Sequence, residues 1–376
     1  MEDMVNAFWQ GRKVFLTGHT GFKGSWLSLW LEQLGAHVMG YALPPHTSPN
    51  LFTVASVASG LASVIGDLGE MEHLQDALLQ HQPEIVFHLA AQSLVRASYQ
   101  DPVRTYETNV LGTARLLEAV RACGSVRAVV IVTTDKCYEN QEWIWAYREN
   151  DPLGGHDPYS NSKACAEFVT RAYRDSFFSP AKYAEHKVAI ASARAGNVIG
   201  GGDWAPDRLI VDIVRAFHSG ETLRIRNPNA TRPWQHVLEP LRGYLTLAEK
   251  LVERGPQFSG GWNFGPHYHD AKPVQWIVEY MAARWATLPS APAPRWQIDS
   301  GVHPHEANML TLDWTKASQH LGWQPVLSLS QALDMTLDWY STVQSGSNAR
   351  QKCLAQIDAY RQALENVSLA GDIRTP

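Results

Sequence analysis

Short apolar runs alternate with segments of helical periodicity from about Arg12 to Ala195. The runs are rich in β-branched residues and comprise Val14–Thr17, His37–Ala42, Ser63–Ile65, Ile85–Leu89, Ala128–Thr133 and Val188–Ala193. Helical stretches such as Gly24–Leu34, which Gly35 can cap, and Met71–Gln80 lie between them. Strands that alternate with helices form a parallel sheet covered by helices on both faces. We therefore expect an α/β fold with a doubly wound, Rossmann-type parallel sheet.

A glycine-rich segment follows the first of these runs directly and leads into a helical stretch. It reads Thr17-Gly18-His19-Thr20-Gly21-Phe22-Lys23-Gly24. Glycines allow a tight turn and a close approach of the backbone, and the amino terminus of a helix attracts phosphate through its free N–H groups and its dipole. An ordinary glycine-rich turn is the alternative. The position between strand and helix favours a dinucleotide site that includes Gly18, Thr20, Gly21, Phe22, Lys23 and Gly24.

The residues alone leave the type of dinucleotide open. The second run ends Tyr41-Ala42-Leu43, without the carboxylate that would hold the ribose of NAD. No arginine follows to take the 2′-phosphate of NADP, although Lys23 could reach one. After the third and fourth runs, Asp67 and Leu68 are suited to an adenine edge, and Ala90 and Ala91 are small enough to lie beside a dinucleotide. All four could equally be plain strand ends.

Beyond Ala195 the pattern changes to segments rich in Gly, Pro, Trp and Arg, mixed with the helical stretches Leu209–His218, Leu241–Arg254 and Val274–Ala286. We expect residues 1–195 to form mainly a dinucleotide-binding domain. Residues 196–376 should form mainly a smaller, mixed α/β substrate-binding lobe, with segments that return to the first domain. Ligands of such folds bind at the carboxyl ends of the strands, so the reactive side chains should gather there.

A tyrosine and a lysine stand one helical turn apart in Tyr159-Ser160-Asn161-Ser162-Lys163. A phenol has an ordinary pKa of about 10, so it acts as a base at neutral pH only where positive charge stabilises the phenolate. Lys163 and a bound nicotinamide ring would supply that charge. A surface pair with a solvated lysine is the alternative. Together with the glycine segment, the pair predicts a catalytic base, Tyr159, and its cation, Lys163, both beside the cofactor.

The fifth run ends in Thr133-Thr134-Asp135-Lys136. We expect Thr134 to donate a hydrogen bond to the reacting oxygen of a substrate beside Tyr159. An acid and a potential base follow at once, and an elimination needs both in addition to hydride transfer. We expect Asp135, held protonated, to be the acid, and Lys136 to take a proton or to polarise a ketone. Which of the two removes the proton stays open, and a solvated turn is the alternative for both.

Composition limits the other partners. The formal charge of −5 is modest and the basic residues are spread along the chain, which argues against binding to nucleic acid or to a membrane surface. The four cysteines lack metal-ligand spacing and are too few for a disulfide framework, so we expect free thiols and no metal site. No apolar stretch suits a signal peptide or a membrane span, so we expect a cytoplasmic protein.

Several segments together resemble one known family. They are Gly18–Gly24, Thr133–Tyr138, Trp143–Trp145, Tyr159–Lys163, Arg194–Trp204 and Arg232–Val237. From about Gly11 to Trp339 the chain resembles the extended short-chain dehydrogenases/reductases, and within them the nucleotide-sugar 4,6-dehydratases. Members that act on dTDP- or GDP-sugars commonly carry Asp-Glu after the threonine. This chain carries Asp-Lys, as the CDP-glucose branch does.

The resemblance implies NAD as the cofactor, a nucleotide sugar as the substrate and a homodimer as the assembly. It implies that Asn109 orders the central helix and that Asn197 contacts the substrate diphosphate. Arg208 and Arg232 would neutralise phosphate charge. Ion pairs at the surface or between the lobes are the alternative for both arginines, and for Arg208 the two interpretations are equal. His305, followed by Glu306, would close the nucleotide pocket.

The implied reaction is that of a lyase. The sugar is oxidised at C4, water is eliminated across C5 and C6, and hydride returns to C6. A 4-epimerase uses the same Tyr, Lys and Thr without an elimination acid or base, so Asp135 and Lys136 argue against it. A dehydratase of another nucleotide sugar is a further alternative. A nucleotide-sensing protein that performs no catalysis typically loses the Tyr/Lys pair.

Overall fold

The computed structural model describes residues 7–289, 291–299, 301 and 309–372. At its centre is a seven-stranded sheet in which all neighbouring strands are parallel. The strand order is β11-β6-β5-β4-β1-β2-β3, so the direction of winding reverses between β1 and β4. The strands are β1 (Lys13–Thr17), β2 (His37–Ala42), β3 (Ala62–Ile65), β4 (Ile85–His88), β5 (Ala128–Val132), β6 (Ala189–Ala195) and β11 (Gly260–Phe264). The predicted doubly wound parallel sheet is confirmed.

Alternate side chains of each strand serve two cores, one on each face of the sheet. In β1, Val14 and Leu16 belong to one buried cluster and Phe15 to the other, as the two-residue period of a strand requires. The first face is covered by α2 (Phe22–Gln33), α11 (Leu238–Arg254) and α15 (Ala349–Asp372). The second face is covered by α4 (Met71–His81), α7 (Gly112–Ala122) and α8 (Pro158–Ser176).

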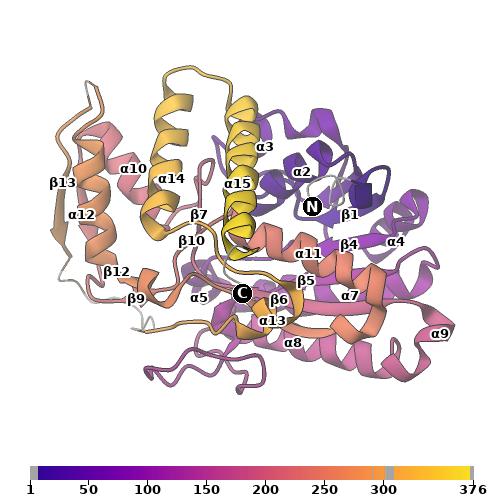
Figure 1. The fold of residues 1–376 in the computed structure, drawn as a ribbon. Coiled ribbons are helices and arrows are strands. Elements are labelled where there is room, and N and C mark those ends of the chain that lie inside the picture. Colours follow the sequence, from indigo (N-terminus) through magenta and orange to yellow (C-terminus); the bar gives the residue numbers. More distant parts are fainter. Residues whose placement is uncertain (1–6, 290, 300, 302–308, 373–376) are drawn as a thin grey trace.

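A smaller lobe of mixed helices and strands lies at one end of the molecule, on the left in Figure 1. Its main parts are α10 (Leu209–Ser219), β8 (Thr222–Ile225), α12 (Val274–Trp285) and β13 (Arg295–Ile298). Strands β8 and β13 pair in parallel. Two further short pairs are β7 (Val198–Ile199) with β10 (Gln235–His236) and β9 (Thr231–Arg232) with β12 (Lys272–Pro273). Helix α14 (Leu329–Gln344) packs against α15 and α12.

Strand β11 comes from beyond residue 195 and forms an edge of the central sheet beside β6. Helix α11 likewise packs against β5 and β6. The division of the chain at residue 195 stays a prediction. The remaining elements are α3 (Leu51–Val54), η1 (Val57–Gly60), α5 (Val95–Gln100), α6 (Pro102–Tyr106), the π-helical turn η2 (Glu107–Leu111), η3 (Asp135–Cys137), η4 (Pro180–Lys182), α9 (Tyr183–His186), η5 (Gly255–Phe258), η6 (Tyr268–Asp270) and α13 (Thr315–Leu321).

Two helices begin earlier than the sequence pattern predicts. Helix α2 begins at Phe22 rather than Gly24, because Gly21 adopts an extended conformation as the residue before the first turn. Helix α11 begins at Leu238 rather than Leu241 and contains Pro240 in its first turn, where a proline is tolerated because the N–H that it lacks has no partner within the helix.

All four cysteines are free, as expected. Within the described ranges, no helix is both long and apolar enough to cross a membrane.

Candidate active site

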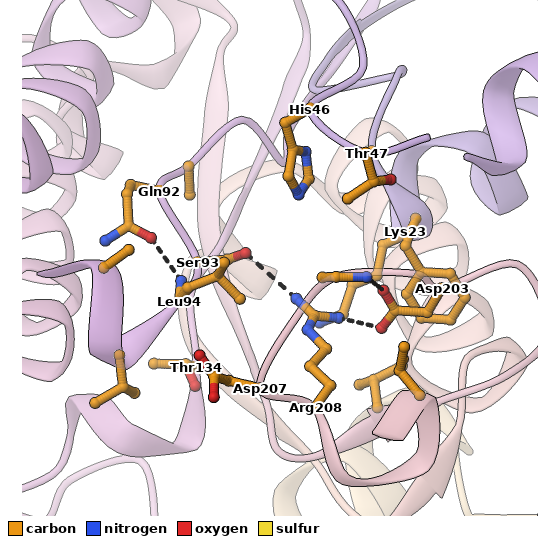
Figure 2. Close-up of a pocket in the computed structure, with 18 of the residues that line it drawn as sticks. Lys23, His46, Thr47, Gln92, Ser93, Leu94, Thr134, Asp203, Asp207 and Arg208 are labelled. Atoms are coloured by element: carbon orange, nitrogen blue, oxygen red, sulfur yellow. Dashed lines mark hydrogen bonds and ion pairs between the residues drawn. The ribbon is translucent and has the colours of Figure 1, made fainter. Parts of the chain in front are cut away.

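A cleft of about 710 Å³ opens at the carboxyl ends of the central strands, between the sheet and the smaller lobe. That volume lies within the range of about 300–1,000 Å³ that is usual for small-molecule sites. Figure 2 shows part of its lining, to which Lys23, Thr134 and Arg208 contribute. Residues of the glycine segment, Thr134 and Tyr159 line this one cleft at the strand ends.

The predicted site residues in the described part of the chain all line this cleft. They are Gly18, Thr20, Gly21, Phe22, Lys23, Gly24, Asp67, Leu68, Ala90, Ala91, Thr134, Asp135, Lys136, Tyr159, Lys163, Asn197, Arg208 and Arg232. His305 and Glu306 lie outside the described residues. The individual roles of these residues stay predictions.

The glycine segment forms the turn between β1 and α2. At Gly18 and Gly24 there is no room for a side chain. Gly18 has φ +80°, and a Cβ atom there would lie 2.7 Å from the backbone nitrogen of Ala90. A Cβ atom at Gly24 would lie 2.1 Å from the carbonyl oxygen of Gly18. The first turn of α2 carries no acidic side chain, so its amino terminus offers an anion free N–H groups and no like charge.

Lys23 lies in the first turn of α2 and contributes a second positive feature to the cleft (Figure 2). The pKa of Lys23 is lowered to about 7, mainly by burial and also by the positive charges of Arg208 and Lys163, while Asp135 and Asp203 oppose the shift. A phosphate beside Lys23 would favour the charged amine, because an opposite charge stabilises it.

Tyr159 and Lys163 lie in the first two turns of α8, with both side chains buried. Burial raises the pKa of the Tyr159 phenol to about 12, while a hydrogen bond with Thr134 acts in the opposite direction. Burial lowers the pKa of Lys163 to about 8, and its amine donates a hydrogen bond to the carbonyl oxygen of Val132 at 3.1 Å. At neutral pH the protein alone therefore holds a neutral phenol beside a lysine that is still largely charged.

Helix α8 is anchored at the turn that carries Tyr159. Asp157 precedes the helix and accepts a hydrogen bond from the backbone N–H of Ser160 at 3.0 Å. The buried Asn109 donates to Ser162 Oγ at 2.8 Å, and its Oδ1 accepts from the N–H of Gln92 at 2.8 Å. Asn109 thus ties α8 to the segment after β4, which agrees with the ordering role expected for it.

Asp135 begins the short turn η3 directly after β5 and is buried. Its Oδ1 accepts a hydrogen bond from Thr134 Oγ1 at 2.9 Å. Its Oδ2 is buried and has no hydrogen-bond partner among the described residues. A Cβ atom at Gly196 would lie 2.5 Å from this Oδ2, so the glycine lets the end of β6 approach the carboxyl group. Lys136 follows and lines the same cleft.

Arginines from two parts of the chain extend the cleft toward the smaller lobe. Arg208 donates to Asp203 Oδ2 at 2.6 Å and to Ser93 Oγ at 3.3 Å (Figure 2). It therefore forms an ion pair and lines the cleft at the same time, and its role toward phosphate stays a prediction. Arg232 is buried in β9 and donates to the carbonyl oxygen of Thr231 at 3.1 Å.

Sequence reasoning missed a charged bridge at the same cleft. Asp207 forms ion pairs with Arg96 of α5 at 3.0 Å and with Arg226, which follows β8, at 3.5 Å. Asp207 adopts a left-handed conformation with φ +61°, which is uncommon for a residue with a side chain. Asp203, by contrast, lies in the Arg194–Trp204 segment that carried the family resemblance, and that resemblance could have pointed to it.

Comparisons with known proteins agree with this geometry. The family model described as GDP-mannose 4,6 dehydratase matches residues 15–336. A CDP-glucose 4,6-dehydratase of Salmonella typhimurium is 55% identical over 333 residues, which cover 89% of this chain and 91% of that protein.

Two solved structures share the fold. MoeE5 in complex with UDP-glucose and NAD is 26% identical with a TM-score of 0.71, and the match covers 88% of this chain and 99% of that one. A dTDP-glucose 4,6-dehydratase of Bacillus anthracis in complex with NAD is 22% identical with a TM-score of 0.72, and covers 89% of this chain and 98% of its own. The matched family model and the Salmonella relative show that this chain belongs to the nucleotide-sugar 4,6-dehydratases of the extended short-chain dehydrogenase/reductase family.

Proposed function

We propose that the protein is a lyase that converts CDP-glucose into CDP-4-keto-6-deoxyglucose and water, with NAD as its resident cofactor. One observation carries the proposal. The side chains suited to an oxidation, Thr134, Tyr159 and Lys163, line the same cleft as Asp135 and Lys136, which are suited to an elimination. The choice of CDP-glucose rests on the Asp-Lys pair and on the activity named for the Salmonella relative.

The chain offers the features that a dinucleotide requires. The backbone of Gly18–Gly24 and the amino terminus of α2 form a cradle for the diphosphate, and Lys23 adds positive charge there. Asp67 and Leu68 would border the adenine, and Ala90 and Ala91 would border the middle of the cofactor. When bound, NAD accepts a hydride from C4 of the sugar and returns it to C6, so the complete reaction consumes no oxidant or reductant.

In the first half of the reaction, Tyr159 takes the proton of the 4-hydroxyl group. Its phenol is a weak base in the protein alone, because burial raises its pKa to about 12. The charged Lys163 stabilises the phenolate, and the nicotinamide adds a second positive charge when it is bound. Thr134 lies beside Tyr159, and its hydroxyl group, which donates to Asp135 in the free protein, would donate to the same sugar oxygen once the substrate is bound.

In the second half, the new ketone at C4 makes the proton on C5 acidic. Lys136 takes this proton or polarises the ketone that acidifies it. Asp135 gives its proton to the departing 6-hydroxyl group, which leaves as water. When hydride returns to C6 a proton returns to C5, and the proton that Tyr159 took from the 4-hydroxyl group restores Asp135. Oδ2 of Asp135 is buried and has no hydrogen-bond partner among the residues that the structure describes, which supports this assignment, because a carboxyl oxygen in such a place favours the protonated form.

The substrate diphosphate would lie among Asn197, Arg208 and Arg232, with guanidinium groups as its ligands. His305 would close the nucleotide pocket. We further propose that the protein works as a cytoplasmic homodimer in the synthesis of a lipopolysaccharide O-antigen sugar. The membership of this chain in the nucleotide-sugar dehydratase family supports these assignments.

A panel of substrates tests the proposal. The purified protein is incubated with NAD and, separately, with CDP-, dTDP-, UDP- and GDP-glucose, and the products are identified by mass spectrometry and NMR. CDP-glucose should lose one molecule of water with no net change in nicotinamide oxidation. Turnover of another nucleotide sugar alone would make the substrate assignment wrong. Formation of the C4 epimer would make the reaction type wrong.

A further inference from the structure

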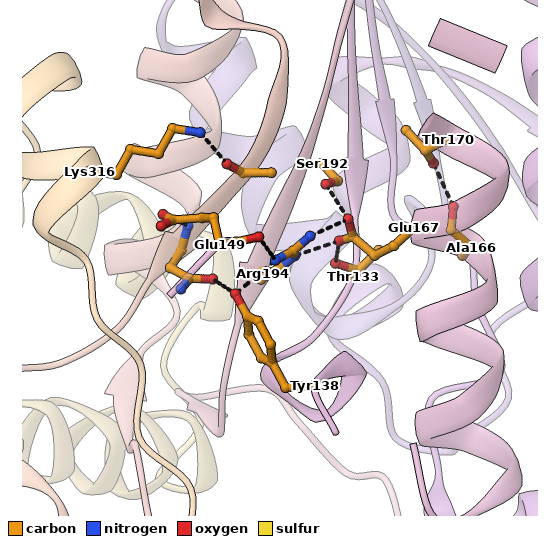
Figure 3. A network of polar contacts seen from close by, with 11 residues as sticks. Thr133, Tyr138, Glu149, Ala166, Glu167, Thr170, Ser192, Arg194 and Lys316 are labelled. Atoms are coloured by element: carbon orange, nitrogen blue, oxygen red, sulfur yellow. Dashed lines mark hydrogen bonds and ion pairs between the residues drawn. The ribbon is translucent and has the colours of Figure 1, made fainter. Parts of the chain in front are cut away.

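A buried ion pair lies one helical turn beyond Lys163, outside the cleft. Glu167 of α8 and Arg194 of β6 have side chains that are each only 5% exposed, and Arg194 Nη2 lies 2.8 Å from Glu167 Oε2. Arg194 Nε donates to the other carboxylate oxygen at 3.0 Å (Figure 3). The contact is therefore bidentate, which is the strongest geometry for this pair of groups.

The same carboxylate also joins the end of β5 to the middle of β6. Thr133 Oγ1 and Ser192 Oγ each donate a hydrogen bond to Glu167 at 2.6 Å. Thr133 is the residue before Thr134, so the contact fixes the strand end that carries the substrate-facing hydroxyl. Figure 3 shows the four side chains converging between α8 and the sheet.

Glu167 is held in its charged form. Burial raises the pKa of its carboxyl group, but the charge of Arg194 and the hydrogen bonds from Arg194, Ser192 and Thr133 outweigh burial and leave the pKa below its usual value. Arg194 itself is fixed from the other side, because it also donates to Tyr138 Oη at 2.8 Å and to the carbonyl oxygen of Glu149 at 3.1 Å.

We propose that Glu167 is a positioning residue of the reaction, whose buried charge keeps Lys163 protonated and whose hydrogen bond to Thr133 fixes the strand end before Thr134. The proposal rests on the function assigned to Tyr159 and Lys163 above. Residues three or four positions apart are neighbours on a helix face, so Tyr159, Lys163 and Glu167 form one continuous row along α8. Glu167 touches neither substrate nor cofactor in this arrangement.

The charges around Lys163 support this role. Burial lowers the pKa of Lys163 to about 8, and Glu167 is the leading opposing influence, followed by Cys137 of η3. Burial raises the pKa of the Cys137 thiol far above its usual value, so it is neutral near pH 7. Burial lowers the pKa of His88 of β4 to about 3, and that residue is neutral too.

Two further groups face Lys163. Tyr159 is a neutral phenol, because burial raises its pKa to about 12. The positive charge of Lys23 works against a second positive charge on Lys163. Among these neighbours Glu167 carries a full negative charge, and Arg194, which is paired with it, carries a positive charge that acts on Lys163 in the opposite direction.

The protonation of Lys163 can be measured without any substrate. The ε-carbons of lysine are labelled with ¹³C in the full-length protein, with and without NAD, and the Lys163 signal is assigned by its absence in Lys163→Met. The signal is then titrated in the wild type, Glu167→Gln, Glu167→Asp and Glu249→Gln. Glu249 is a suitable control because it is partly buried, accepts a hydrogen bond from Trp9 at 2.6 Å, and lies on α11 outside the cleft lining.

We expect the pKa of Lys163 to fall by about 1 unit or more in Glu167→Gln, because an opposite charge at close range shifts a pKa by about 1–3 units. The Asp variant should restore most of the difference, and Glu249→Gln should leave the Lys163 titration unchanged. The alkaline limb of the kcat/KM profile should move to lower pH by a similar amount. An unchanged Lys163 titration in folded Glu167→Gln protein would overturn the proposal.

Glu167→Gln leaves Arg194 as an unpaired buried charge and could prevent folding. The double variant Glu167→Gln/Arg194→Met removes both charges while it keeps the volume. We expect this variant to fold and to show a smaller fall in the pKa of Lys163, because the positive charge of Arg194, which opposes a proton on Lys163, is removed together with the negative charge of Glu167. A wild-type titration in the folded double variant would contradict the proposal. Because the titration needs no turnover, its result is separate from the question of whether CDP-glucose is the substrate.

Discussion

Thr134 donates a hydrogen bond to Asp135 at 2.9 Å, so the hydroxyl group assigned to the oxidation is tied directly to the carboxyl group assigned to the elimination. The link holds both groups at the end of β5. A substitution of one group can therefore change the position of the other, so the oxidation and the elimination are coupled. Variants that separate the two halves are therefore informative.

The first prediction concerns the base. Tyr159→Phe removes the group that takes the proton of the 4-hydroxyl, while the ring stays packed in its buried position. We expect kcat to fall by about 10²–10⁴-fold, which is the usual contribution of general base catalysis. The measurement is the rate of product formation from CDP-glucose, with cofactor binding measured in parallel. An enzyme of near-normal rate would refute the role of Tyr159.

The second prediction separates the two elimination groups. In a single turnover with CDP-glucose, Lys136→Met should still reduce the nicotinamide, and it should form a 4-keto sugar with little deuterium entering C5 from heavy water. Asp135→Asn should also reduce the nicotinamide and should fail mainly at loss of the 6-hydroxyl group, so exchange at C5 can continue. If either variant is blocked before nicotinamide reduction, that residue belongs to the oxidation.

The third prediction follows from the close approach of β6 to Asp135. Gly196→Ala would place a methyl group 2.5 Å from Asp135 Oδ2 and 2.5 Å from Pro233 Cγ, so the carboxyl group or the strand end must move. A misplacement of about 1 Å can cost about 10²-fold in rate. We expect product formation to slow by that order while nicotinamide reduction persists. Gly124→Ala is the control, because a Cβ atom there meets nothing within 4 Å, and unchanged kinetics in Gly196→Ala would contradict the account.

The fourth prediction concerns stability at acid pH. His236 of β10 is fully buried, and burial lowers its pKa from 6.5 to about 3. Below pH 6.5 the unfolded chain binds a proton at this residue and the folded chain does not, so the free energy of unfolding falls as the pH falls. His88 and His19 are also buried with lowered pKa values and add to the effect.

Replacement of His236 by leucine removes the proton that the unfolded wild-type chain binds at this position. Between neutral pH and about pH 5, His236→Leu should lose about 2 kcal/mol less unfolding free energy than the wild type, at roughly 1.4 kcal/mol for each pH unit below the ordinary pKa. Denaturant unfolding at the two pH values measures this difference. The exposed His218→Leu serves as the control, and an equal loss in wild type and His236→Leu would show that His236 does not contribute.

The sequence predicts those parts of the fold and site whose position depends only on the strand or helix that the residues belong to or directly follow. The glycine segment directly follows β1, and Thr134 follows β5. A parallel sheet brings both to the same edge, and this does not depend on the conformation of the connecting loops. Tyr159 and Lys163 are four residues apart in a helix, and this spacing places them on the same face. These features need only strand and helix patterns.

The features that sequence reasoning missed depend on contacts between distant segments. Arg96 and Asp207 are 111 residues apart and meet only because the smaller lobe folds over α5. Glu167 and Arg194 are 27 residues apart and meet because α8 packs on β6. The sequence pattern places the start of α11 at Leu241, three residues too late. A proline interrupts the interior of a helix but is tolerated in its first turn, where Pro240 lies.

The central claim is that one cleft oxidises C4, eliminates water and returns the same hydride to C6. The most direct test uses CDP-glucose that carries deuterium at C4, incubated with the purified protein and NAD in ordinary water. Product analysis by NMR should find the deuterium at C6 of a 4-keto-6-deoxy sugar. Deuterium that remains at C4, or that is absent from C6, would contradict the proposed reaction.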